Sequence, residues 1–183
     1  LPAAGILLIV LLQAAGLENN LRYDRQAILG GEVWRLFTGN LVHLGWPHLW
    51  LNAFGLLLIW LLFGLLFSPL VWLLQAAWAS LAVGLGLLWF DPGLSWYVGL
   101  SGTLHGLFVA GVLTEGRTHR NFAMLVFAVF IAKLAWEQFY GPLPGSERSA
   151  GGHVVVNAHL YGTIGGLLGY SLQTAIRRFA ARN

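Results

Sequence analysis

The residue best suited to chemistry in this sequence is Ser101, which lies among glycines in the stretch Gly99-Leu100-Ser101-Gly102. A serine hydroxyl becomes a nucleophile when a base takes its proton, and neutral histidine is the side chain best matched to that task near neutral pH. A separate apolar segment carries such a histidine, His159. These residue types predict nucleophilic hydrolysis, with Ser101 as the nucleophile and His159 as the general base.

A second pair of polar residues could stabilise the negative charge that develops on an attacked carbonyl oxygen. His48 and Asn52 lie four residues apart, which places them on one face of a helix, one turn from each other. Together with the backbone amide of Ser101 they would form an oxyanion hole. Because no acidic residue lies near His159 in the sequence, we expect a Ser-His dyad without a carboxylate.

Two other uses of the histidines compete with this interpretation. His105 lies four residues after Ser101 and is a rival base, since a helical side chain leans back toward the preceding turn. Neighbours stacked along one helix are poorly aligned for proton transfer, which favours His159. His43 and His48 could bind zinc, but the sequence has no HExxH motif and no convergent carboxylate, so we expect no metal and no cofactor.

The composition indicates an integral membrane protein. Of the 183 residues, 57% are hydrophobic and only 9% are charged, and the mean hydropathy is +0.71, whereas about a quarter of the residues in a soluble domain are charged. The absence of cysteine excludes disulfide bonds and a thiol nucleophile. A net charge of +3 is too small to indicate nucleic-acid binding.

The apolar runs predict an all-α bundle of six membrane-spanning helices, in a single domain over residues 1–183. The predicted spans are 1–16, 47–67, 70–90, 101–114, 121–140 and 153–176. The first is short and begins without methionine, so we expect its leading residues to be missing. Residues 17–46 mix charged and apolar side chains and predict a structured loop in the membrane interface. Within it, Trp34 and Arg35 fit either an interfacial anchor or a scaffold.

Two arginine clusters predict the orientation of the bundle. One follows the fourth predicted span and the other follows the sixth, and the clusters comprise Arg117, Arg120, Arg177, Arg178 and Arg182. Two spans separate the clusters, so both lie on the same side, and the positive-inside rule makes that side cytoplasmic. Both termini are then cytoplasmic and the loop 17–46 faces outward.

The candidate residues fall at one predicted depth. Ser101, Asn52 and His159 lie 16 to 18 residues from the cytoplasmic ends of their spans, which is roughly 24 to 27 Å at about 1.5 Å per residue. We therefore expect a polar layer, in a water-filled cavity, just below the outer surface. We expect none of the seven carboxylates in this layer. Lys133 and Glu137, one turn apart, predict a local ion pair near a helix end rather than a proton relay.

Small residues could let the fourth and sixth spans approach closely enough for a serine to reach an imidazole. They recur every fourth residue in both spans, as Gly102, Gly106 and Ala110 and as Ala158, Gly162 and Gly166. Such faces allow helix backbones to come into contact.

Four motifs occur in order in separate segments: Glu32-x-Trp34-Arg35, His43-x4-His48-x3-Asn52, Gly99-Leu100-Ser101-Gly102 and Ala158-His159-x2-Gly162. In these motifs the sequence resembles the rhomboid intramembrane serine proteases over nearly its whole length. The resemblance implies a six-helix rhomboid fold and cleavage of a substrate's transmembrane segment near its outer end by Ser101 and His159. It also implies an oxyanion hole as above, with supporting roles for His105, Gly99, Gly102, Gly162, Trp34 and Arg35.

One position departs from the common pattern, because His105 stands where many rhomboids carry tyrosine. The pattern Gly-Leu-Ser-Gly-x-x-His-Gly is similar to the rhombosortase subgroup. That subgroup is associated with bacterial membrane proteins whose C-terminal anchor has a Gly-Gly motif, a membrane helix and a basic tail. The resemblance therefore implies such substrates, a location in the bacterial inner membrane, and a His105 that packs beside His159 and whose share in proton transfer is open.

Two other function classes remain as alternatives. One is an inactive rhomboid-like protein that binds transmembrane segments without cutting them, against which the presence of both Ser101 and His159 argues. The other is a transporter with a broken helix, which predicts internal repeats and a site at the midplane of the membrane. The sequence shows no repeat, and the polar layer is off-centre.

Overall fold

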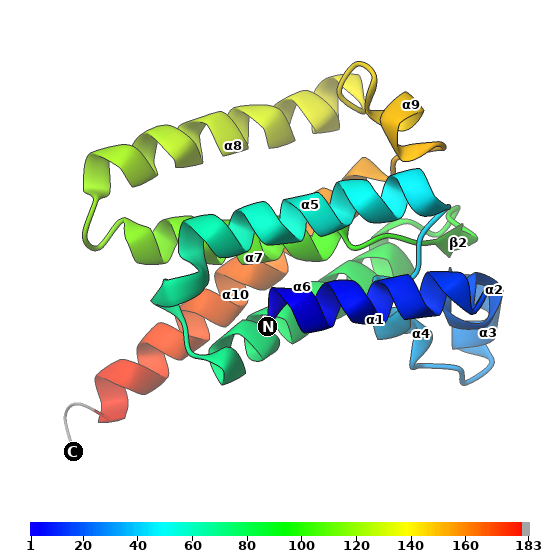
Figure 1. The fold of residues 1–183 in the computed structure, drawn as a ribbon, viewed down its shortest axis with the longest axis horizontal. Coiled ribbons are helices and arrows are strands. Elements are labelled where there is room, and N and C mark those ends of the chain that lie inside the picture. The colour runs from blue at the N-terminus through cyan, green and yellow to red at the C-terminus, as the bar shows by residue number, and fades with distance from the viewer. Residues whose placement is uncertain (181–183) are drawn as a thin grey trace.

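The computed structural model describes residues 1–180, which fold almost entirely into helices (Figure 1). In chain order the elements are α1 (Pro2–Ala14), α2 (Glu18–Leu21), β1 (Tyr23–Asp24), α3 (Arg25–Leu29), α4 (Arg35–Thr38), α5 (Trp46–Phe63), the 3-10 helix η1 (Gly64–Leu66), α6 (Pro69–Phe90), β2 (Trp96–Tyr97), α7 (Ser101–Glu115), α8 (Arg120–Tyr140), α9 (Ser146–Ala150) and α10 (Val156–Ala180). The predicted all-α class is confirmed. The six predicted helices are present within a few residues of their expected bounds.

Proline and a capping serine begin two of the long helices. Pro47 lies in the first turn of α5, where its missing N–H costs no hydrogen bond. Ser68 precedes α6, and its hydroxyl accepts a hydrogen bond from the backbone N–H of Val71 at 3.4 Å, while Pro69 is the first residue of the helix. Ser68 and Pro69 thus separate α6 from the helical segment that ends at Leu66.

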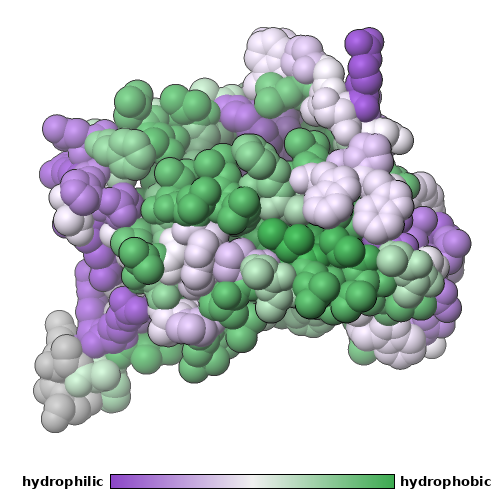
Figure 2. All heavy atoms as spheres, viewed as in Figure 1, coloured by the Kyte–Doolittle hydropathy of each residue, from purple (hydrophilic) through white to green (hydrophobic). Residues whose placement is uncertain are grey.

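Within residues 1–180, three helical segments are long and apolar enough to cross a bilayer: Trp46–Leu66, Pro69–Phe90 and Arg120–Tyr140. Figure 2 shows hydrophobic side chains across the middle of the molecule and hydrophilic ones gathered toward its two ends. This distribution fits an integral membrane protein. Helices α1 and α7 are shorter, with 13 and 15 residues, and α10 does not meet the same criterion. The count of six membrane crossings stays a prediction.

Helix α7 is the central element and packs against α5, α6, α8 and α10 (Figure 1). The predicted small-residue faces meet where α7 crosses α10. A Cβ atom on Gly162 would collide with the backbone of Gly102, and one on Gly166 would collide with the backbone of Gly106. The prediction of close backbone contact between these two helices is therefore confirmed.

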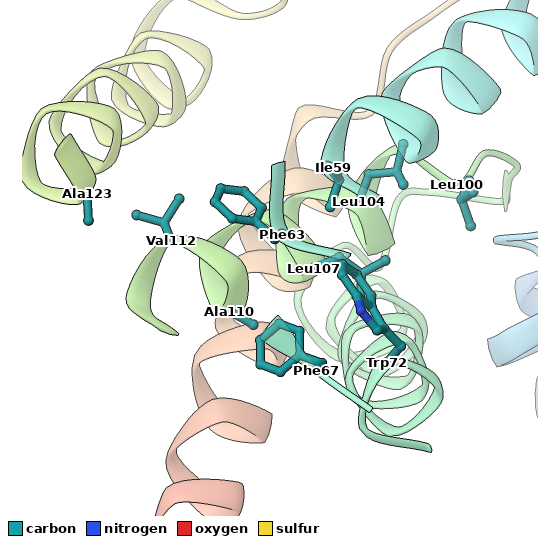
Figure 3. Close-up of a cluster of buried hydrophobic side chains, with 10 residues drawn as sticks. All are labelled: Ile59, Phe63, Phe67, Trp72, Leu100, Leu104, Leu107, Ala110, Val112 and Ala123. Carbon is teal, nitrogen blue, oxygen red and sulfur yellow. The ribbon is translucent and has the colours of Figure 1, made fainter. Parts of the chain in front are cut away.

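The largest hydrophobic cluster runs along α7 from Leu100 to Val112. Figure 3 shows side chains from α5, α6 and α7 pointing toward one another, with Phe63, Leu107 and Trp72 at the centre. Trp72 also donates its indole N–H to the backbone oxygen of Gly64 at 3.2 Å, which ties α6 to the end of α5. This cluster fixes the helices that carry the polar residues, and it contains none of those residues itself.

The loop between α1 and α5 is structured, as predicted, and Arg35 holds it together. Arg35 bonds Glu32 at 2.6 Å and the backbone oxygens of Asn19 and Arg22 at 3.2 and 3.0 Å. Trp34 is 50% exposed. Arg35 is therefore a scaffold residue within the loop, whereas Trp34 faces outward.

A pair of short strands and one short helix are absent from the sequence-based prediction. Strands β1 and β2 pair antiparallel, with Tyr23 opposite Tyr97. Helix α9 lies in the segment 141–152, between the fifth and sixth predicted spans. The strand pair matters for the site, because it joins the first loop to the segment that leads into α7.

The basic clusters lie at one end of the bundle. Arg117 donates a hydrogen bond to the hydroxyl of Thr174 at 3.0 Å, and its guanidinium lies 5.6 Å from the ring centre of Tyr170. The turn after α7 and the last part of α10 are therefore adjacent, as the orientation argument requires. Arg182 lies outside the described residues.

Candidate active site

Ser101 is the first residue of α7, and the segment before it is tightly fixed. The hydroxyl of Tyr97 donates to the backbone oxygen of Gly99 at 2.6 Å, and the Gly99 N–H donates to the backbone oxygen of Gly39 at 3.0 Å. Gly99 has φ +128°, a conformation that L side chains rarely adopt, and a Cβ there would strike the His48 ring. The first loop and β2 thus set the position of Ser101.

Ser101 and His159 form a hydrogen bond across the crossing of α7 and α10. Ser101 Oγ lies 3.0 Å from His159 Nε2. His159 is 5% exposed, whereas Ser101 is partly exposed. The glycine contact between the helices makes this distance possible, because a larger residue at Gly102 or Gly162 would separate the two backbones.

A carboxylate lies behind His159, and the prediction that none occupies this layer is wrong. Glu137 Oε2 lies 2.9 Å from His159 Nδ1, and Glu137 is 3% exposed. Counted from Arg120, Glu137 lies 17 residues along its helix, about 25 Å at about 1.5 Å per residue. The depth argument, applied to this span as to the others, would have placed Glu137 level with Ser101.

The Lys133–Glu137 pair is present, but it is more than a local ion pair. Lys133 Nζ lies 2.6 Å from Glu137 Oε2, 2.5 Å from His105 Nε2 and 3.3 Å from His159 Nδ1. These contacts join α8 to α7 and α10. The pair therefore belongs to the polar layer and is not a surface feature of one helix.

His105 packs beside His159, as the resemblance implies. The two rings are stacked, with centroids 4.1 Å apart and planes inclined by 9°. His105 Nδ1 lies 2.7 Å from the backbone oxygen of Ser101, which can only accept, so Nδ1 carries the proton. Nε2 then accepts from the Lys133 ammonium. Both ring nitrogens of His105 are thus used by groups other than the Ser101 hydroxyl.

His48 and Asn52 lie on one face of α5, as predicted, and both are buried. His48 Nδ1 accepts the backbone N–H of Leu44 at 3.4 Å, so the proton of the neutral ring is on Nε2. That edge lies against Gly99, two residues before Ser101. Asn52 donates one amide hydrogen to the backbone oxygen of His48 at 3.0 Å and keeps a second. Each side chain therefore retains one N–H donor.

Comparison with known proteins gives the family. The family model of the Rhomboid domain matches residues 30–173. The chain belongs to the rhomboid family. No curated protein matches the chain at a significant level. The matched segment contains every residue of the polar layer, and the members of the family are intramembrane serine proteases.

The rhomboid site holds one set of side chains with the composition of a metal site. His105, Glu137 and His159 each offer a ligand atom, and these atoms lie within 4.8 Å of one another. The Lys133 ammonium lies within 3.3 Å of an atom of each of the three, so a cation already fills the space between them. His43, the other candidate, is fully buried, and burial together with the neighbouring His48 lowers the pKa of His43 to about 3.

A buried polar cluster of Thr103, Asn40 and Ser80, which the sequence analysis missed, lies next to the rhomboid site. Thr103, two residues after Ser101, donates to Asn40 Oδ1 at 3.1 Å, and its hydroxyl lies 2.9 Å from that of Ser80. Asn40 comes from the first loop and Ser80 from α6. The cluster joins three parts of the chain beneath the first turn of α7. Threonine and asparagine carry no sequence pattern that would have predicted it.

Proposed function

We propose that this rhomboid is an active intramembrane serine endopeptidase in which Ser101 is the nucleophile and His159 is the general base. The observation that carries the proposal is the 3.0 Å hydrogen bond between Ser101 Oγ and His159 Nε2. A base within hydrogen-bond reach of a hydroxyl is the geometry that nucleophilic catalysis requires.

The reaction would run through an acyl-enzyme. Ser101 Oγ attacks the carbonyl carbon of the scissile peptide, its proton passes to His159 Nε2, and the carbonyl electron pair moves onto oxygen. The oxyanion then collapses, the C–N bond breaks, and the leaving amine takes the proton from His159. Water, deprotonated by the same imidazole, hydrolyses the ester and restores Ser101.

The oxyanion would bind to N–H groups at the start of α7 and on α5. The backbone N–H of Ser101 is in the first turn of a helix, where it has no partner within that helix. His48 and Asn52 each keep a donor, as described above. Loss of one such donor typically lowers kcat by about 10²- to 10³-fold.

We infer that the substrates are membrane proteins with a C-terminal anchor of the Gly-Gly type, cleaved near the outer face of the bacterial inner membrane. The support is the Gly-Leu-Ser-Gly-x-x-His-Gly pattern, with His105 stacked on His159 in place of the tyrosine common in rhomboids. The basic clusters at one end of the bundle support cytoplasmic termini and an active site toward the outer face.

A cleavage assay in detergent tests the catalytic proposal. A substrate with a Gly-Gly motif, a membrane helix and a basic tail is incubated with the wild type and with Ser101→Ala, His159→Ala and His105→Tyr. We expect no turnover with the first two variants and residual turnover with the third. Replacing the Gly-Gly motif by Ala-Ala in the substrate should slow cleavage.

Each alternative gives a different pattern in this assay. Equal product from the wild type and Ser101→Ala would remove Ser101 from the mechanism. Binding of the substrate by the wild type without any cleavage would indicate the inactive rhomboid-like protein. Turnover that survives in His159→Ala but not in His105→Tyr would transfer the role of base to His105.

A further inference from the structure

Helix α8 brings two opposite charges to the same nitrogen of His159. Glu137 Oε2 lies 2.9 Å and Lys133 Nζ 3.3 Å from His159 Nδ1. The carboxylate can only accept a hydrogen bond, whereas the ammonium can only donate one. The two side chains therefore favour opposite tautomers of the imidazole, and the shorter contact is the one to the carboxylate.

We propose that Glu137 is a positioning residue that selects the Nδ1–H tautomer of His159, and that Lys133 would select the opposite tautomer if the carboxylate were lost. The inference rests on the proposed roles of Ser101 and His159. Only the Nδ1–H tautomer leaves a lone pair on Nε2, the atom that faces the Ser101 hydroxyl. Once His159 accepts the serine proton, the same carboxylate stabilises the imidazolium.

Lys133 is kept from acting on His159 by two closer acceptors. Its ammonium lies 2.6 Å from Glu137 Oε2 and 2.5 Å from His105 Nε2, both shorter than the contact to His159. His105 in turn donates to the backbone oxygen of Ser101. Donors and acceptors alternate from the Ser101 carbonyl through His105, Lys133 and Glu137 to His159. Removing the carboxylate leaves the ammonium with a free donor beside Nδ1.

The packing of α8 sets the height of both charged side chains. Phe130 and Leu134 are buried against Val109 of α7, and the Phe130 ring lies 5.6 Å from the ring of His105. Lys133 lies between Phe130 and Leu134 in the sequence, and Glu137 follows one turn later on the same face. The apolar contacts therefore hold the register that places Glu137 behind His159.

Four titratable or charged side chains surround the imidazole of His159. They are His105 from α7, Lys133 and Glu137 from α8, and His48 from α5, whose charged form would interact with that of His159. Of these, only Glu137 is an anion. Its replacement by a neutral group removes the attraction for the imidazolium and leaves the repulsion from Lys133.

A fluorophosphonate probe tests the proposal without a peptide substrate. Ser101 Oγ would attack the phosphorus and displace fluoride while its proton passes to His159 Nε2, so the labelling rate reports how readily His159 accepts that proton. The rate is measured against pH on the full chain in detergent for the wild type, Glu137→Gln, the double variant Glu137→Gln with Lys133→Met, and Ser101→Ala. Gln138→Ala, at an exposed position on the same helix, is the matched control.

We expect Glu137→Gln to lower the labelling rate by about 10²- to 10⁴-fold and to move the acid limb of the pH–rate profile about 1 to 3 pH units lower. The double variant should recover about tenfold over Glu137→Gln, because the competing donor is gone. It should still label more slowly than the wild type. A purely structural role for Glu137 predicts that the labelling rate recovers only in proportion to the folded fraction, because Lys133→Met also removes the unpaired ammonium. Thermal unfolding of each variant therefore accompanies the labelling, and recovery of the rate at equal folded fraction supports the positioning role.

Each other outcome overturns a stated part of the reasoning. Equal labelling of the wild type and Glu137→Gln would remove Glu137 from the mechanism while leaving Ser101 and His159 in place. A folded double variant as slow as the single variant would refute the competition from Lys133. Equal labelling of the wild type and Ser101→Ala would overturn the proposed function and, with it, the role of Glu137. If Glu137→Gln fails to fold with Lys133 unpaired, the double variant still tests Glu137 against the wild type.

Discussion

The close approach of α7 and α10 makes a quantitative prediction for Gly102→Ala. A Cβ at Gly102 would lie 2.7 Å from the backbone oxygen of Ala158 and 2.7 Å from Val83 Cγ2. Val83 can change its rotamer, but the carbonyl of Ala158 is part of the α10 backbone. Raising that distance from 2.7 Å to the 3.4 Å of ordinary contact requires α7 to withdraw by about 0.7 Å.

This displacement acts directly on the reacting pair. Ser101 precedes Gly102 and His159 follows Ala158, so the Oγ–Nε2 distance should grow from 3.0 Å to about 3.7 Å, which exceeds the hydrogen-bond range. A misplacement of about 1 Å can lower a rate about 10²-fold. We therefore expect Gly102→Ala to lower kcat about 10- to 100-fold, and overpacking should lower the free energy of unfolding by about 1 to 3 kcal/mol.

The assay compares kcat and KM for a model transmembrane substrate in detergent, together with thermal unfolding. Gly116→Ala, at the C-terminal cap of the same helix, is the control, because its Cβ would meet nothing closer than 3.4 Å, at Ala123. We expect that control to match the wild type. A Gly102→Ala protein with unchanged kcat and unchanged unfolding would refute the claim that this glycine sets the distance between nucleophile and base.

Two further predictions concern parts of the chain that support the site. Thr103→Val removes the hydrogen bond to Asn40 Oδ1 and should lower the free energy of unfolding by about 1 to 3 kcal/mol in a thermal melt, whereas Thr103→Ser should not. The backbone N–H of Val154, and then His153, hold the pKa of Glu147 below its ordinary value. The stabilisation they provide is therefore present at neutral pH and lost as the pH falls through that lowered pKa. Limited proteolysis of residues 141–155 should accelerate in acid in the wild type, and the same rise in a Glu147→Gln protein would contradict the assignment.

Residue spacing and composition were sufficient to predict the long helices, the faces on which two of them meet, and the level of the reacting residues. The lengths of the long apolar runs predict α5, α6 and α8, because a bilayer of fixed thickness demands about 20 apolar residues per crossing. The recurrence of Gly102 and Gly106, and of Ala158 and Gly162, predicts which faces of two helices meet. The level of Ser101 and His159 follows from counting residues, since an α-helix rises by a constant amount per residue.

Rotation and register between helices were decided only by the tertiary structure. Residue counting gives the height of Glu137 but not the direction in which it points, and the packing of Phe130 and Leu134 against α7 turns Glu137 toward His159. A helical side chain leans toward the preceding turn, which likewise directs His105 toward Ser101. That tendency does not decide whether His105 contacts the hydroxyl or the backbone oxygen of Ser101, and the structure shows the backbone oxygen.

The sequence by itself thus determined which residues could react and the layer in which they lie, because both depend on residue type and on distance along one helix. The tertiary structure decided which atom of each side chain meets which partner. The strand pairing of Tyr23 with Tyr97 and the contacts of Lys133 with three side chains join segments far apart in the sequence. Such contacts depend on how separate helices and loops pack, and no periodicity within one segment encodes them.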